Sequence, residues 1–398
     1  MEKPTVLFVL GTRPEAIKCA PVIRACLEDT ALRVRVLTTS QHRELQDNVL
    51  EFFGIHPDHD LALMGEKSDL NRLVGEGWAG LAAYFQTEPP NLTLTQGDTT
   101  TAFLAALAAQ YHRIPVGHIE AGLRTFDKSN PFPEEINRRL IAPLADLHFA
   151  PTTQAKENLL KENIDAGKIF VVGNPGIDAL LYAVNHLSAA DRRNIRCRFS
   201  LGERYILVTS HRRENWGENL QNLCRALREI VARYSDIMIL FLVHPNPEVS
   251  QTVHKALSGI ERIVLQPAVP YLEMAALLSG SLLALTDSGG IQEEAPALGK
   301  PVLVLREKTE RPEGVEAHSS LLVGTDPERI LSAVNQLLSD AEYYRRYSRI
   351  RSPYGDGRAA QRIHQGIRWY FHLGDPPDEI QDRDLETIGG ETSCGIGS

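Results

Sequence analysis

The chain has 398 residues, of which 43% are apolar and 23% charged, and its formal net charge is −9 at pH 7. That length fits two α/β domains better than one core, and the composition is that of a globular protein. The negative balance, without any basic run, argues against nucleic acid as a partner. No apolar run is long enough to span a bilayer, and the sequence opens directly into a strand pattern, so we expect a cytoplasmic protein with no membrane partner.

Short apolar runs alternate with helical patterns along the chain, which predicts βαβ units and parallel sheets buried on both faces. In the first half we expect strands at 5–10, 33–38, 91–95, 115–117, 147–149 and 169–172, with helices at 15–29, 44–53, 70–85 and 99–111. In the second half we expect strands at 205–208, 237–243, 263–265, 282–285 and 302–305, with helices at 219–234, 271–278 and 291–298.

Gly173-Asn-Pro-Gly176 interrupts the alternation and predicts a domain boundary. We assign the first domain to residues 1–173 and the second to 174–357. The helix expected near 358–372 comes too late to be the next crossover of the second series, so we expect it to complete the first domain. Residues 373–398 are acidic, carry few large apolar side chains and predict a disordered tail. The five scattered cysteines contain no C-x-x-C pair and predict neither a zinc site nor disulfides.

Charged and small residues gather where predicted strands end, at the edge where doubly wound sheets bind ligands. The first cluster is Gly11-Thr-Arg-Pro-Glu-Ala-Ile-Lys18, with Thr12 as the expected helix cap. Its helix-start amides would attract an anion, and Arg13 and Lys18 add two cations. A solvated basic helix start explains the same pattern, so this cluster alone is ambiguous.

Three carboxylates follow later strands of the first half. Asp98, in Gln96-Gly-Asp-Thr-Thr-Thr101, is either a helix N-cap or an acid–base group. Glu120 lies between an apolar strand and an Ala-Gly turn, where a carboxylate is costly unless it faces a cleft or a cation, which favours a catalytic role. Glu134 follows a proline and either serves the helix dipole or joins the chemistry.

The second half repeats this logic. His211 lies on the loop Ser210-His-Arg-Arg-Glu-Asn-Trp-Gly217, and its position between a strand end and two arginines favours a functional role. The run 286–296, Thr-Asp-Ser-Gly-Gly-Ile-Gln-Glu-Glu-Ala-Pro, predicts a strand, a tight turn and a helix start whose amides approach a diphosphate. Glu294, the second glutamate of this run, lies about 9 Å from Ser288 along the helix axis. That is near the distance from a diphosphate to the ribose hydroxyls, from which a carboxylate can accept hydrogen bonds. The predicted contacts are Ser288, Gly289, Gly290, Glu294 and, from the next loop, Arg311.

These motifs occur in the order found in one family. The chain resembles the non-hydrolysing bacterial UDP-N-acetylglucosamine 2-epimerases over roughly residues 4–372. The matching motifs are Gly-Thr-Arg-Pro-Glu-Ala-Ile-Lys, Gln-His-Arg-Glu, Gly-Asp-Thr-Thr, Glu-Ala-Gly-Leu-Arg-Thr, Pro-Glu-Glu-Ile-Asn-Arg, His-Arg-Arg-Glu, Asp-Ser-Gly-Gly-Ile-Gln-Glu-Glu-Ala-Pro and Glu-Arg-Pro-Glu. The resemblance implies a glycosyltransferase-B-like fold, in which two Rossmann-like α/β domains with parallel sheets face each other across a cleft.

The resemblance also implies site residues. Substrate contacts fall on Arg13, Lys18, Asp98, Glu120, His211, Ser288, Gly289, Gly290, Glu294 and Arg311. Residues implicated in catalysis fall on Asp98, Glu120, Glu134 and His211. An activating site for a second UDP-N-acetylglucosamine is matched by Gln41, Glu44, Glu135 and Arg212. Two stretches depart from the family pattern: 266–271, where uracil contacts near Val269 and Met274 are expected, and the hinge 173–176.

The implied activity is reversible conversion of UDP-N-acetylglucosamine to UDP-N-acetylmannosamine, in supply of cell-surface polysaccharide precursors. It needs neither NAD nor a metal, and the resemblance suggests a homodimer. A retaining glycosyltransferase of the same fold would share the diphosphate site but have an acceptor groove. A sibling epimerase for a diacetamido uronate sugar is associated with Gly-Ala-Arg-Pro-Gln, whereas this chain has Gly-Thr-Arg-Pro-Glu. A non-catalytic nucleotide-sugar sensor would lack the acid–base residues, which are present here.

Overall fold

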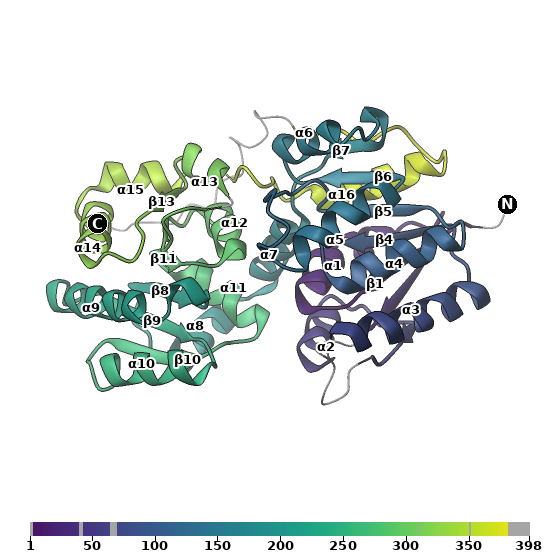
Figure 1. Ribbon diagram of the computed structural model, residues 1–398. Helices are drawn as coiled ribbons and strands as arrows, with labels where there is room; N and C mark the ends of the chain where they lie inside the picture. The colour runs from purple at the N-terminus through teal and green to yellow at the C-terminus, as the bar shows by residue number, and fades with distance from the viewer. Residues whose placement is uncertain (1–2, 40–42, 64–69, 310, 350–351, 381–398) are drawn as a thin grey trace. The chain divides into compact units, whose positions relative to one another are not determined.

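The structure is a computed structural model that describes residues 3–39, 43–63, 70–309, 311–349 and 352–380 (Figure 1). The chain forms two compact units. The first contains the described residues up to Ala179 and those from Tyr354 onwards, and the second is Leu180–Pro353. In the part of the chain that the structure describes, no helix is long and apolar enough to cross a bilayer.

The first unit is built on a parallel sheet of seven strands in the order β3-β2-β1-β4-β5-β6-β7. These strands are β1 Thr5–Leu10, β2 Arg33–Thr38, β3 His59–Asp60, β4 Leu92–Gln96, β5 Val116–Ile119, β6 Leu147–Ala150 and β7 Ile169–Val171. All except β3 were predicted. The two polar residues of β3 leave no apolar run in the sequence.

The helices of the first unit cover both faces of its sheet. They are α1 Arg13–Leu27, α2 Arg43–Phe52, α3 Leu70–Thr87, α4 Thr100–Tyr111, α5 Glu134–Ile141, α6 Thr153–Lys161 and α16 Ala359–Tyr370, with α7 Pro175–His186 leading into the second unit. α4 is alanine-rich and buried on nearly every side because it packs between α3 and α5. α16 packs against α1, where His364 and Arg368 contact the carboxylate of Asp29.

The limits of the two units differ by a few residues from the predicted domain limits. The compact units divide inside α7 and before Tyr354, whereas the sequence placed the limits at 173/174 and 357/358.

Part of the segment predicted to be a disordered tail, 373–398, lies against the sheet at residues 379–380. Glu379 accepts hydrogen bonds from Lys156 and from the amide of Val171. The amide of Ile380 donates to Val171 as well. Backbone pairing with an edge strand needs no apolar side chains, so composition did not reveal it. Residues 381–398 lie outside the described part.

The second unit has a parallel sheet of six strands in the order β10-β9-β8-β11-β12-β13. Its strands are β8 Tyr205–Ser210, β9 Met238–Val243, β10 Ile263–Pro267, β11 Leu283–Thr286, β12 Val302–Val304 and β13 Ser320–Leu322. Its helices are α8 Ala189–Arg198, α9 Glu218–Arg233, α10 Pro247–Leu257, α11 Tyr271–Gly280, α12 Gly289–Ala297, α13 Pro312–Glu316, α14 Pro327–Ser339 and α15 Ala341–Ser348. Among the strands, the short β13 was not predicted.

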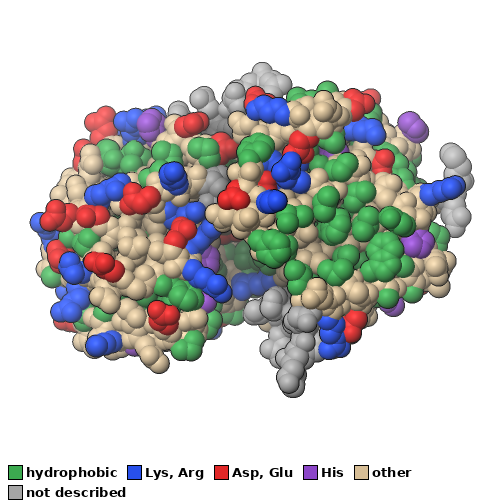
Figure 2. Space-filling view, viewed as in Figure 1, with side chains coloured by type: hydrophobic (Ala, Val, Ile, Leu, Met, Phe, Trp, Pro, Cys, Tyr) green, Lys and Arg blue, Asp and Glu red, His purple; other side chains and the backbone are tan. Residues whose placement is uncertain are grey.

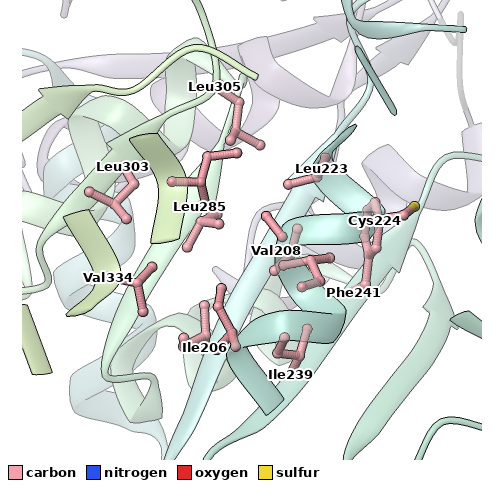
Figure 3. Close-up of a cluster of buried hydrophobic side chains, with 14 of the residues drawn as sticks. Ile206, Val208, Leu223, Cys224, Ile239, Phe241, Leu285, Leu303, Leu305 and Val334 are labelled. Carbon is pink, nitrogen blue, oxygen red and sulfur yellow. The ribbon is translucent and has the colours of Figure 1, made fainter. Parts of the chain in front are cut away.

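Burial on both faces explains why most strands were readable from the sequence. In β8, Ile206 and Val208 join a core cluster on one face, and Leu207 joins a second cluster on the other. Successive side chains of a strand point to opposite faces, so a strand covered on both sides needs a continuous apolar run. Figure 3 shows the first cluster, where Val208 packs with Phe241 and neighbouring strands.

The strand order places a switch point in each sheet. The chain leaves β1 through β2 to β3 and then returns with β4 to the other side of β1. The second unit does the same, with β11 returning beside β8. At such a point the loops after the two central strands separate, and doubly wound sheets bind ligands there. The loops after β1 and β4, and after β8 and β11, therefore mark the ligand-binding edge of each unit.

Candidate active site

The loop between β1 and α1 is held by a buried carboxylate that sequence reasoning missed. Glu15 is 1% exposed, and its Oε2 accepts hydrogen bonds from the amides of Gly11 (3.1 Å) and Thr12 (2.5 Å). Its Oε1 accepts a third from the Thr99 hydroxyl (2.8 Å), and burial raises the pKa of Glu15 to about 7. The amides of Gly11 and Thr12 therefore already have an acceptor within the protein. The spacing Thr-x-x-Glu, a capping-box signature, was the signal for this arrangement.

Glu120, the carboxylate expected to be catalytic, lies directly after β5 and is 9% exposed. Lys18 from α1 donates to its Oε1 at 2.6 Å, and the side-chain amide of Gln96, at the end of β4, donates to its Oε2. The backbone of Glu120 has a φ of 65°, a left-handed conformation uncommon for a residue with a Cβ. Such backbone strain is typical of functional sites and persists where surrounding contacts hold it.

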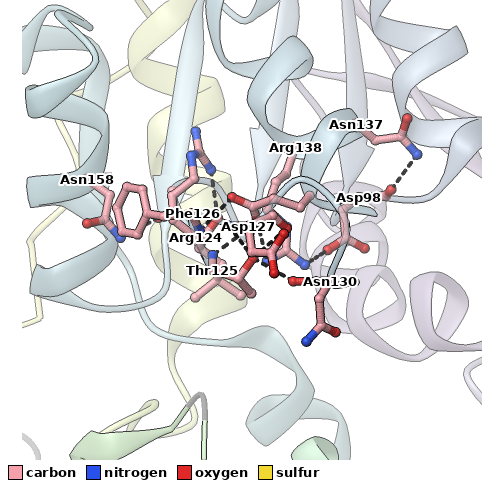
Figure 4. A network of polar contacts seen from close by, with 12 residues as sticks. Asp98, Arg124, Thr125, Phe126, Asp127, Asn130, Asn137, Arg138 and Asn158 are labelled. Carbon is pink, nitrogen blue, oxygen red and sulfur yellow. Dashed lines mark hydrogen bonds and ion pairs between the residues drawn. The ribbon is translucent and has the colours of Figure 1, made fainter. Parts of the chain in front are cut away.

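Asp98 is not the cap of α4. That position belongs to Thr99, whose hydroxyl accepts from the amide of Ala102 at 3.0 Å. The Asp98 carboxylate pairs instead with Arg138 on α5, and its carbonyl accepts from the Asn137 side chain at 2.9 Å (Figure 4). The acid–base interpretation of Asp98 thus has no competing capping role, and Arg138 is a second residue that the sequence did not single out.

The first turn of α5 presents two glutamates with different surroundings. Both oxygens of Glu135 accept hydrogen bonds from backbone amides, those of Thr125 and Phe126, each at 3.1 Å, so this buried side chain holds the preceding loop. Glu134 is half-buried, and its Oε2 is a buried atom that has no hydrogen-bond partner among the described residues. An unpaired buried oxygen is costly. We expect such a carboxylate oxygen to gain a hydrogen-bond partner from a bound ligand, or to take up a proton.

A buried histidine supports the turn that carries Asp98. The Nε2 of His118 lies 2.7 Å from the carbonyl of Gly97, which can only accept, so Nε2 carries the proton. Burial lowers the pKa of His118 to about 4, and it lowers that of His148, its register partner on β6, to about 3. Both rings are therefore neutral in the folded protein at physiological pH.

These two histidines predict the acid sensitivity of the fold. A base whose folded pKa is lowered stabilises the protein above its unfolded pKa, near 6.5, and this contribution is lost as pH falls towards 4. Each group adds a slope of about 1.4 kcal/mol per pH unit to the free energy of unfolding. Denaturant titrations between pH 7.5 and 4.5 should show a shallower slope for His148→Asn. The exposed His56→Asn is the control, and an unchanged slope in His148→Asn would contradict the assignment.

In the second unit, the buried Asp287 organises the loop after β8. Its carboxylate accepts from the amides of His211 and Arg212, from the Ser210 hydroxyl (3.1 Å) and from the Asn215 side chain (2.8 Å). It also contacts Nδ1 of His211 at 2.5 Å. Burial opposes ionisation of Asp287, but these hydrogen bonds outweigh it and lower its pKa. Asp287 therefore fixes the orientation of the His211 ring, which is 46% exposed at its side chain.

The turn 288–290 begins α12, as predicted. Arg311 packs against this turn. Its guanidinium carbon is so close that a Cβ added to Gly289 would stand only 3.0 Å from it. The Nε of Arg311 donates to Glu293 at 2.7 Å, and Glu293 is the buried neighbour of the predicted Glu294, which is half-buried. The structure thus brings Arg311 to the Ser-Gly-Gly turn and adds a partner that the sequence did not reveal.

The other predicted residues fall as follows. Arg13 is the first residue of α1 and is half-buried. Val269 and Met274 are partly buried against the core of the second unit. Gln41 and the side chain of Glu44 lie outside the described residues.

A family model described as UDP-N-acetylglucosamine 2-epimerase matches residues 24–368. The chain is 46% identical over 375 residues to the UDP-N-acetylglucosamine 2-epimerase of Bacillus subtilis, which covers 94% of this chain and 97% of that protein. A crystal structure of UDP-GlcNAc 2-epimerase from Neisseria meningitidis bound to UDP-GlcNAc is 42% identical, with a TM-score of 0.85 and coverage of 91% and 99%. The Methanocaldococcus jannaschii enzyme in complex with UDP-GlcNAc and UDP is 34% identical, with a TM-score of 0.76 and coverage of 92% and 99%.

Two doubly wound parallel units that match these structures over nearly their whole length define a protein of glycosyltransferase-B-like fold. The carboxylates beside the first sheet and the Ser-Gly-Gly turn beside the second are the features expected of an enzyme for nucleotide sugars. The chain belongs to the UDP-N-acetylglucosamine 2-epimerase family, and it is an isomerase.

Proposed function

We propose that this enzyme inverts carbon 2 of UDP-N-acetylglucosamine, reversibly giving UDP-N-acetylmannosamine for cell-surface polysaccharide precursors. Family membership supports the substrate, and related structures hold UDP-GlcNAc. The observation that carries the proposal is the set of carboxylates at the edge of the first sheet. Asp98 contacts Arg138, Glu120 contacts Lys18, and Glu134 has an unpaired buried oxygen within the described part of the chain.

The chemistry follows from the substrate. No carbonyl is adjacent to C2, so its hydrogen is not acidic enough for direct removal and return. We propose an anti-elimination: a carboxylate takes the C2 proton, the C2–H electron pair forms a C1=C2 double bond, and the C1–O bond breaks with its pair leaving on UDP. The intermediate is 2-acetamidoglucal. UDP then adds back to C1 while a proton arrives on the opposite face of C2. This series of reaction steps is redox-neutral, and no hydride acceptor takes part.

The first unit supplies the proton transfers in this proposal. Removal and return on opposite faces of C2 require two acid–base groups, for which Asp98, Glu120 and Glu134 are the candidates. Glu120 is held at both oxygens by Lys18 and Gln96, so its orientation is set before the substrate arrives. The contact with Arg138 does the same for Asp98.

The second unit holds the nucleotide in this proposal. The amides of the 288–290 turn and the guanidinium of Arg311 bind the diphosphate, and Glu294 binds the ribose. His211, oriented by Asp287, supplies a further donor to the leaving phosphate oxygen. Val269 and Met274 are the proposed uracil contacts.

The activity is tested by incubating the protein with UDP-N-acetylglucosamine alone and following the anomeric protons by NMR. We expect UDP-N-acetylmannosamine to appear, and the same equilibrium mixture to be reached from the opposite side. A glycosyltransferase would consume the donor only with an acceptor, without inverting C2. An epimerase specific for a diacetamido uronate sugar would leave UDP-N-acetylglucosamine unchanged.

The proposal extends to assembly and regulation. The resemblance suggests a homodimer, and apolar side chains gather on the visible face of the first unit (Figure 2). The exposed large apolar side chains of this unit include Leu70, Val74 and Tyr111. A second UDP-N-acetylglucosamine would activate the enzyme at Gln41, Glu44 and Arg212, and Glu135, which is buried, would act there through the loop that it holds. Sedimentation and the dependence of rate on substrate concentration test these two points; a monomer with hyperbolic kinetics would contradict both.

Arg311 should be a ground-state contact to the diphosphate. We expect Arg311→Ala to weaken UDP binding by about 1.5–3 kcal/mol, the value of hydrogen bonds to charged groups. Calorimetry with UDP measures this directly. Asp236→Asn, which breaks the Arg204–Asp236 pair at the amino ends of β8 and β9, is the matched control. Unchanged UDP affinity in Arg311→Ala would remove this residue from the site.

A further inference from the structure

The carboxylate of Glu293 stands beside a site proposed for an anion. It lies one turn into α12, four residues after Gly289, and is 6% exposed. Its Oε1 accepts from Nε of Arg311 at 2.7 Å. A buried negative charge next to a diphosphate disfavours binding by simple Coulomb repulsion. We therefore expect Glu293 to make a favourable contribution that outweighs this repulsion.

The geometry of Arg311 indicates that role. Its guanidinium lies flat enough against the turn that a Cβ at Gly289 would meet Cζ, Nη2 and Nε at 3.0–3.3 Å. An arginine side chain has many rotamers, and holding it at one place costs conformational entropy. The ion pair at Nε directs the side chain to the turn, and the planar guanidinium then has a set orientation.

A second tether fixes the backbone of the same residue. The Thr309 hydroxyl donates to the Gln292 side chain at 2.6 Å and accepts from the amide of Arg311 at 3.1 Å. Two consecutive residues of α12, Gln292 and Glu293, thus hold the backbone and the side chain of Arg311 respectively. Both contacts run from the helix whose start forms the proposed diphosphate turn.

We propose that Glu293 is a positioning residue that holds the Arg311 guanidinium against the 288–290 turn before the nucleotide binds. This inference rests on the proposed function of Arg311. Preorganisation of this kind raises affinity because the ordering cost is met during folding and not on binding. Glu293 contacts Arg311 and does not itself have to touch the substrate.

A positioning role and a pure charge effect of Glu293 predict opposite changes in UDP affinity when this side chain is removed. If Glu293 acted only through its charge, its removal would tighten UDP binding, because one repulsive carboxylate is gone. If it positions Arg311, Glu293→Ala should weaken UDP binding about 10-fold, near the lower end of the loss expected from Arg311→Ala itself. Glu293→Gln keeps an acceptor of the same reach and should lose no more than about 3-fold. Glu293→Asp keeps the charge but is one methylene shorter, and it should fall near the Ala variant.

The experiment is calorimetric titration of UDP into these three variants, Arg311→Ala, the double variant Glu293→Ala/Arg311→Ala and the control Asp236→Asn. In the double variant the loss should not exceed that of Arg311→Ala, because an absent arginine cannot be positioned. Wild-type or tighter binding by Glu293→Ala and Glu293→Asp would overturn the inference, as would full additivity in the double variant. If Glu293→Ala does not fold by circular dichroism, Glu293→Asp and Glu293→Gln carry the same comparison. Unchanged affinity in Arg311→Ala would instead contradict the proposed diphosphate contact.

Discussion

Replacing Glu120 by Gln, or Asp98 by Asn, is expected to lower turnover by roughly 10²–10⁴-fold while UDP still binds. Both substitutions keep the side-chain volume and remove only the capacity to take and return a proton. The local contacts survive in part, because an amide oxygen at position 120 still accepts from Lys18. Loss of turnover with retained UDP affinity therefore separates the chemical role from a role in folding.

The matched control is Glu88→Gln. Glu88 also pairs with a cation, Arg35, at 2.6 Å, but it follows α3 and lies away from the loops after β1, β4 and β5. Steady-state rates by NMR and UDP affinity by calorimetry should be close to those of the wild type. Wild-type turnover in both Glu120→Gln and Asp98→Asn would show that these carboxylates do not carry the proton transfers.

His211→Asn is expected to release the intermediate. If the C1–O bond breaks before UDP returns, the enzyme must hold two fragments without a covalent link, and each weakened contact to UDP favours escape. Asparagine keeps some hydrogen bonding but cannot be cationic. Loss of one charge-assisted hydrogen bond corresponds to roughly 10- to 100-fold faster loss of UDP. Free UDP and 2-acetamidoglucal should therefore accumulate in long incubations.

Mass spectrometry counts both products against epimerised substrate. His254→Asn, an exposed histidine of α10 that contacts Ser258, is the control and should release as little glucal as the wild type. Free N-acetylmannosamine without any glucal, in wild type and variant alike, would instead indicate a hydrolysing epimerase and reject the mechanism proposed here.

Most strands, and half of the α-helices in the described part of the chain, could be predicted because their signals are local. β1 and β8 are continuous apolar runs, since helices cover both faces of their sheets. The Ser-Gly-Gly turn and the strand-end carboxylates were recognisable from their positions between such runs. β3 and β13 are too short to leave a comparable pattern. The resemblance to a family then supplied roles for residues that spacing alone left ambiguous, such as Glu134.

The partners of the site residues could not be predicted, because they are distant in the chain. Lys18 and Glu120 are 102 positions apart, and His211 and Asp287 are 76 apart. Only the strand order brings them together. Asp287 stood within a recognised motif, yet nothing local distinguished its buried role from that of the neighbouring Ser288. Glu15 is different, because its capping-box spacing from Thr12 is local and can be read from the sequence.

In the proposed mechanism, C2 exchanges its hydrogen with solvent during epimerisation. The direct measurement is incubation of the pure protein with UDP-N-acetylglucosamine in heavy water, with deuterium at C2 of both epimers followed by NMR and mass spectrometry. Each molecule of UDP-N-acetylmannosamine formed should carry one deuterium at C2, and substrate returned from the intermediate should gain deuterium too. Conversion without deuterium at C2, or no conversion of UDP-N-acetylglucosamine, would contradict the account.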